Sequence, residues 1–111
     1  MSLIDRDLIM RQLRFMQQLL ARAKKAQAQN DFAGALHELR SGYREALGSP
    51  YELLSQLDAG SARLMLRTTE RQGAYRELLR AEAELLRAQG EEDAAGSIER
   101  RLAQLPDLPG H

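Results

Sequence analysis

The sequence contains no cysteine, which excludes disulfides, thiolate nucleophiles and zinc sites built on thiolates. A chain without cysteine fits a reducing compartment, and we expect a cytoplasmic protein. Its apolar runs are only a few residues long, far short of the ~20 residues that a membrane-spanning helix needs. A targeting peptide requires a purely apolar core and few acidic residues. The first residues instead contain Asp5 and Asp7, and no purely apolar core follows them. We therefore expect neither a membrane partner nor a targeting signal.

An excess of charge of either sign is also missing, because 16 basic residues balance 16 acidic ones. No net field attracts nucleic acid or an anionic membrane. Arginines recur at positions 71, 76, 80 and 87, and again at 100 and 101, but acidic residues between them cancel most of their field. This pattern predicts a solvated helix face, and we expect no nucleic-acid partner.

Residues that favour strands are scarce. The aromatic residues are two Phe and three Tyr, and β-branched residues are few, although strands are enriched in both kinds. Leu, Ala, Arg, Glu and Gln dominate instead, and these residues lose little on entering a helix. With 111 residues, the chain is predicted to form a single all-α domain over 1–111.

Residues that carry common chemistries are scattered or missing. His37 is the only interior histidine, and its neighbour Glu38 cannot share its helical face. The sequence holds neither a phosphate-binding glycine loop nor a G-x-S-x-G nucleophile elbow. Glu82 and Glu84 are interleaved with arginines on what is predicted to be a solvated face. We expect no catalytic residue, no metal and no cofactor, and a small-molecule binder or enzyme is the least favoured alternative.

Apolar spacing and turn residues divide the chain into two helix pairs with an insert between them. A first helix over 4–29 ends at Asn30, which tolerates a left-handed backbone, and Asp31 caps a second helix over 32–47. Gly42, inside that second helix, indicates close packing. The predicted parts are a first helix pair over 4–47, an insert over 49–68, a second helix pair over 70–105 and a disordered tail over 106–111.

The insert is predicted to hold two short helices. Ser49 is the expected cap of one of them, with Pro50 as its first helical residue, and the other spans about 61–68. Gly90 then separates the two long helices of the second pair, which are expected over about 70–89 and 92–105. The leucines of the insert are expected to pack against these long helices.

Two segments of the chain resemble each other. Residues 29–35 (QNDFAGA) and 89–95 (QGEEDAA) align without gaps. Each follows a long alanine-rich helix with a small residue, Ala23 or Ala83, seven positions before the turn at Asn30 or Gly90. This pattern resembles the tetratricopeptide repeat, a helix-turn-helix unit with small residues at such places. The sequence departs from that family at Glu82, where the repeat carries a large apolar residue, and at the insert that separates the two copies.

The whole chain also resembles a family of small, uncharacterised bacterial proteins with an opening similar to residues 4–13, a tetratricopeptide-like turn, a short leucine-rich insert and a second helical pair. That resemblance implies an all-helical fold of tetratricopeptide-like antiparallel hairpins and implies no activity. The expected function is a protein–protein interaction or scaffold module with a polypeptide partner.

The repeat pattern implies where such a partner binds, because the first helix of each pair lines a concave face. The residues carried over to that face are Gln17, Leu20, Lys24 and Gln27 from the first pair, and Glu77, Arg80, Glu84 and Arg87 from the second. Lys24, Arg80 and Arg87 are expected to hold a carboxylate of the partner. Simple solvation of these charges is the competing interpretation.

A heptad-like seam runs along the first helix and offers a second reading. Its members are Ile9, Leu13, Met16 and Leu20, spaced alternately four and three residues apart. The seam is either part of the core of a single chain or the interface of a structural homodimer. The homodimer is therefore the alternative function.

Overall fold

The computed structural model describes residues 6–105, which fold into seven α-helices and no strand. They are α1 (Arg6–Ala28), α2 (Phe32–Ser41), α3 (Tyr43–Leu47), α4 (Tyr51–Gln56), α5 (Ala59–Leu66), α6 (Thr69–Ala88) and α7 (Glu92–Gln104). The prediction of an all-α fold is confirmed for these residues. The predicted start of the first helix at residue 4 and the predicted tail over 106–111 lie outside the described residues.

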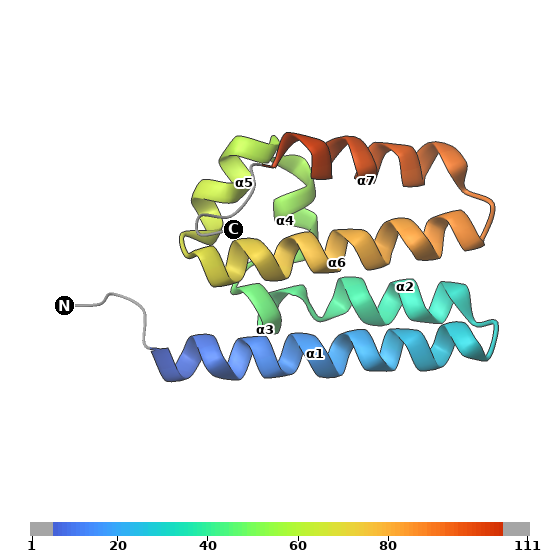
Figure 1. Cartoon of the computed structure of the whole chain (residues 1–111), viewed down its shortest axis with the longest axis horizontal. Coiled ribbons are helices and arrows are strands. Elements are labelled where there is room, and N and C mark those ends of the chain that lie inside the picture. The colour runs from blue at the N-terminus through green and yellow to red at the C-terminus, as the bar shows by residue number, and fades with distance from the viewer. Residues whose placement is uncertain (1–5, 106–111) are drawn as a thin grey trace.

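Helix α6 lies in the middle of the molecule (Figure 1). It packs against α7 on one side and against α1, α2 and α3 on the other. The α6–α7 and α1–α2 pairs make the most extensive helix contacts, and each pair closes as a hairpin. Tyr75, Leu78, Leu79, Leu85 and Leu86 of α6 are all buried, so this helix supplies core along nearly its whole length.

Both hairpins close with the same backbone turn. Asn30 (φ 61°) and Gly90 (φ 84°) adopt left-handed conformations just beyond α1 and α6. In the first turn, the N–H of Asn30 donates to the carbonyl of Gln27, and that of Asp31 donates to the carbonyl of Ala26, both at 2.9 Å. The second turn repeats these two bonds at 3.0 and 2.8 Å. This is the Schellman motif, which satisfies free carbonyls at a helix end, so the similar segments of the sequence form one repeated turn.

The prediction of one continuous helix over 32–47 is wrong, because the helix breaks at Gly42 into α2 and α3. Leu19 of α1 occupies the space beside Gly42, where an added Cβ would stand 2.4 Å from Leu19 Cδ2. The close packing that the sequence predicts at Gly42 is therefore present. Beyond the break, α3 carries Tyr43 into the core, where its side chain is fully buried.

The insert begins differently from the prediction. Helix α4 starts at Tyr51, and its N-cap is Pro50 rather than Ser49. The N–H of Leu54 donates to the carbonyl of Pro50 at 3.2 Å, so the proline is the flanking residue of this helix instead of its first member. Ser49 is buried and makes no side-chain cap to α4.

Helix α5 begins two residues before its predicted start at 61. The reason is that Asp58 caps it and accepts a hydrogen bond from the N–H of Ser61 at 2.7 Å. Leu66 packs in the core as expected, whereas Leu64 is 72% exposed and Met65 is also exposed. The expectation that the leucines of the insert pack inward is wrong for Leu64 and for Leu53 of α4, which is 39% exposed, because both lie on the outer faces of short helices.

Two arginines of the second helix pair bind backbone carbonyls. Arg101 of α7 donates to the carbonyls of Leu54, at 3.5 Å, and Leu57, where α4 ends. Arg76 of α6 donates to the carbonyl of Leu105 at 3.0 Å, where α7 ends. A cation at a helix C-terminus offsets the partial negative charge there. Both arginines therefore serve the fold, and the predicted solvated face does not include them.

Replacing Gly42 with alanine tests the close approach of α1. Gly42 has a negative φ of −88°, which alanine also adopts, so the clash with Leu19 is the main effect of the change. We expect Gly42→Ala to lower the free energy of unfolding by about 1–3 kcal/mol, the usual effect of overpacking a core. Urea unfolding followed by circular dichroism measures the change.

Gly60 is the matched control, because nothing lies within 4 Å of a Cβ added there. Gly60→Ala in α5 should leave stability unchanged or raise it by up to ~1 kcal/mol through better helix propensity. Equal stabilities for the two variants would contradict the account of this packing.

Candidate functional site

A groove between α1 and α6 collects seven of the eight residues that the sequence assigns to a concave face. Its volume is about 430 Å³. The lining residues are Gln17, Leu20, Ala21, Ala23, Lys24 and Gln27 from α1, with Glu77, Arg80, Ala81, Glu84 and Leu85 from α6. We call this surface the α1–α6 groove. Ala21, Ala23, Ala81 and Leu85 are absent from the predicted set, which is polar except for Leu20.

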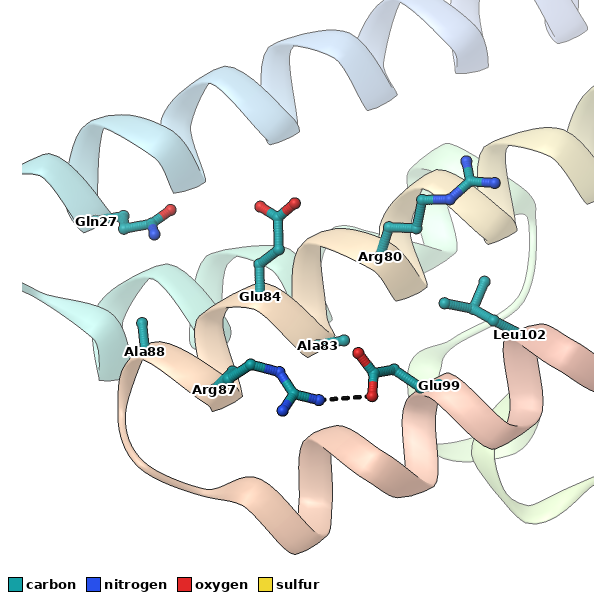
Figure 2. Close-up of a pocket in the computed structure, with 8 residues that line it drawn as sticks. All are labelled: Gln27, Arg80, Ala83, Glu84, Arg87, Ala88, Glu99 and Leu102. Carbon is teal, nitrogen blue, oxygen red and sulfur yellow. Dashed lines mark hydrogen bonds and ion pairs between the residues drawn. The ribbon is translucent and has the colours of Figure 1, made fainter.

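The eighth predicted residue, Arg87, lies in a neighbouring pocket of about 470 Å³ between α6 and α7 (Figure 2). This α6–α7 pocket shares Gln27, Arg80 and Glu84 with the α1–α6 groove. The two hollows therefore lie on either side of one ridge of α6 side chains. Together they bring all eight predicted residues to one continuous surface.

The two arginines of this surface are already paired within the chain. Arg80 Nη1 lies 2.5 Å from Glu77 Oε1, which is the pair that helical spacing predicts. Arg87 binds two carboxylates, Glu99 at 2.5 Å and Glu92. Glu84 has the same spacing to Arg87, but no ion pair forms between them, because Arg87 turns toward α7 (Figure 2). The predicted carboxylate clamp thus has two of its three cations neutralised by the chain's own glutamates.

The floor of the α1–α6 groove is apolar and built into the core. Ala23 and Leu85 are buried, while Leu20 and Ala81 are partly buried and pack against the core cluster. Small side chains on both helices keep the floor low, and charged and amide groups form its rims. A rigid apolar floor with a polar rim is the anatomy of a protein interface.

The residues of the predicted homodimer seam have mixed environments. Ile9 and Met16 are buried within the chain, whereas Leu13 and Leu20 are partly buried. Leu8, beside the seam, is 37% exposed. Half of the seam is therefore used by the intramolecular core, and its other half has surface left to contact another molecule.

His37, the interior histidine, lies beside Ser41 of its own helix. The hydroxyl of Ser41 donates to the carbonyl of His37 at 2.7 Å, and its oxygen is 3.5 Å from His37 Nε2. That hydroxyl proton is directed to the backbone and away from the imidazole. Within residues 6–105, no three His, Cys, Asp or Glu side chains gather closely enough to hold a metal ion. Over the same residues, no helix has the length and apolar character required to cross a membrane.

One prediction about α6 is plainly wrong, because Glu82 is 0% exposed. Its Oε2 accepts hydrogen bonds from Arg40 Nε at 3.0 Å and Nη2 at 2.8 Å, and from the Tyr51 hydroxyl at 2.6 Å. The Arg40 guanidinium also lies over the Tyr51 ring, 5.0 Å from its centre. The missed signal is spacing: Glu82 follows Leu78 and precedes Leu86 by four residues, so it lies on the buried face.

The buried carboxylate joins three helices. Arg40 comes from α2, Tyr51 from α4 and Glu82 from α6. The Tyr43 ring packs edge-on against the rings of Tyr51 and Tyr75, at centroid distances of 5.1 and 6.2 Å. Burial, the hydrogen bond to Glu82 and the nearby negative charge raise the pKa of Tyr51 to about 12. Burial likewise raises the pKa of Tyr43 and of Tyr75 above the ordinary value of 10.0.

Comparison of the sequence and structure with protein-family models, with curated proteins and with solved structures finds no match. The candidate function therefore follows from the geometry of the chain itself.

Removing Arg40 tests the buried ion pair. Arg40→Ala would leave the Glu82 carboxylate buried without its cation, which costs roughly 3–5 kcal/mol at enclosed sites. The Arg40 side chain is 38% exposed, and water can reach its position, so we expect a loss of about 2–4 kcal/mol in the free energy of unfolding. Arg80→Ala, which removes only an exposed pair, should change it by no more than ~0.5 kcal/mol. If Arg40→Ala and Arg80→Ala unfold at the same urea concentration, the ion pair between Arg40 and Glu82 is no more important for stability than an exposed pair.

The tyrosine pKa values predict a loss of stability at alkaline pH. Folded Tyr51 keeps its proton until about pH 12, whereas an unfolded tyrosine loses it near 10.0. Between these values the folded chain binds more protons than the unfolded chain, so the free energy of unfolding falls as pH rises. Urea unfolding at several pH values in this window measures the slope, which Tyr51→Phe should reduce. A slope that is identical in Tyr51→Phe would show that this hydroxyl is not involved.

Proposed function

We propose that the chain is a polypeptide-binding module without catalytic activity, and that its binding site is the α1–α6 groove. The observation that carries the proposal is the meeting of Gln17–Gln27 and Glu77–Leu85, two segments far apart in sequence, around one groove at the residues that the repeat pattern selects. We also propose the cytoplasm as its compartment, since a chain without cysteine suits a reducing environment.

The shape of the groove supports a polypeptide ligand. Its floor offers the partly exposed side chains of Leu20 and Ala81 to apolar groups, and its rims carry amide and charged groups. Helices and extended peptides bind such grooves by placing apolar residues on the floor and polar residues at the edges. The walls belong to α1 and α6, the two longest helices of the described chain, so a ligand meets a preformed surface.

The arrangement of the helices supports a tetratricopeptide-like pair of hairpins. The first helices of the two pairs, α1 and α6, lie side by side, and each pair closes with the same left-handed turn. Ala23 and Ala83, the small residues of the repeat pattern, are both buried. The same features are compatible with the resemblance to small bacterial proteins, which we retain as a proposal about family.

A homodimer through α1 is the second candidate, and the exposure of Leu8 beside the partly buried Leu13 and Leu20 favours it. Multi-angle light scattering distinguishes the candidates, because a module that acts as a monomer elutes with the mass of one chain, 12.5 kDa. A particle of twice that mass, dissociated by Leu13→Glu, would favour the homodimer.

Blocking the groove tests the proposed function. Peptides of about 12 residues, which form roughly three helical turns, can be selected from a random display library on the immobilised protein. Ala21 is exposed on the groove wall, so Ala21→Arg should fill the groove without disturbing the core and weaken the selected peptides by at least about tenfold. Fluorescence anisotropy measures the affinities.

The matched control is Ala28→Arg, because Ala28 is also exposed on α1 and does not line the groove. It should leave the affinities unchanged. Selected peptides that bind equally well to both variants, or a selection that yields no binder at all, would contradict the proposed function.

A further inference from the structure

The charges of the α1–α6 groove are not equally available to a ligand. Glu77 and Arg80 neutralise each other at 2.5 Å. Within residues 6–105, Lys24 and Glu84 take part in no ion pair, and both side chains are exposed. The free charges of the groove are therefore one cation and one anion.

These two charges stand on opposite walls. Lys24 belongs to α1 and Glu84 to α6, and both line the same groove. The carboxylate of Glu84 points toward α1 rather than toward Arg80 or Arg87 on its own helix (Figure 2). Arg87 is held by Glu92 and Glu99 on the α7 side, so the arginine three residues along its own helix is not available to Glu84.

A ligand of one charge sign suits only one wall. An acidic segment would be attracted by Lys24 but repelled by Glu84, whereas a basic segment would be attracted by Glu84 but repelled by Lys24. A segment with an acid along one edge and a base along the other gains at both walls. Gln17 and Gln27 add amide groups that can pair with polar groups of either sign or with peptide bonds.

We infer that the groove binds an amphipathic polypeptide segment that carries opposite charges on its two edges. Its apolar residues lie on the floor, an acidic side chain pairs with Lys24, and a basic side chain pairs with Glu84. This inference rests on the proposed function and narrows its ligand from a polypeptide segment of any charge to one that carries both an acid and a base. Because the two walls differ in sign, the segment binds in a single direction along the groove.

Charge reversal at each wall tests the inference with the same random peptide library. Peptides selected on the natural chain should combine apolar residues with one acid and one base. On Lys24→Glu the selected acid should be replaced by a base, and on Glu84→Lys the selected base should be replaced by an acid. A peptide selected on the natural chain should bind each variant about three- to tenfold more weakly, and exchanging its facing residue for one of opposite charge should restore the affinity.

Two control variants make the same charge changes outside the groove. Lys25→Glu and Glu45→Lys alter exposed residues that do not line it, and both should select the same peptides as the natural chain. Peptides that lose affinity in Ala21→Arg but are indifferent to charge at positions 24 and 84 would overturn this inference and leave the proposed function standing. Peptides of a single charge sign selected on the natural chain would also overturn it. If none of the selected peptides loses affinity for Ala21→Arg, the proposed function itself is wrong.

Discussion

The carboxylate of Glu82 has to be held where no water reaches it, and this requirement fixes how α6 is rotated. Arg40 from α2 and Tyr51 from α4 both bind its Oε2 atom, so the middle helix is tied to two neighbours at one point. Turning α6 about its axis would break all three hydrogen bonds and leave a charge buried without a partner. The ion pair between Arg40 and Glu82 therefore fixes the rotation of α6 about its own axis, whatever its net contribution to stability.

The groove follows from that rotation. With Glu82 directed at α2 and α4, the adjacent Ala81 is directed toward α1, and Glu84 lies on the same side. Two other constraints place α1 opposite them: Leu19 fills the space left by Gly42, and the repeated Schellman turns return each hairpin. The proposed binding surface thus lies at the edge of the core, on the side of α6 that faces α1, and its small alanines are the reason that it is hollow.

The sequence predicts the helices well where local chemistry decides them. Asn30 and Gly90 mark turns because few other residues accept a left-handed backbone, and the leucine spacing defines the faces of α1 and α6. It fails where partners distant in sequence decide. Glu82 looks solvated beside its charged neighbours, since nothing local reveals that Arg40 and Tyr51 will reach it. The arginines at 76, 87 and 101 look free for the same reason, although each binds a group of its own chain.

The most direct test of the account is a map of amide chemical-shift changes when a selected peptide is titrated into the labelled protein. The account predicts that the largest changes fall on α1 between residues 17 and 27 and on α6 between residues 77 and 85, the two walls of the α1–α6 groove. Changes centred instead on Leu53, Leu64 and Met65, the exposed apolar residues of the insert, would contradict the account. They would place the binding surface on α4 and α5.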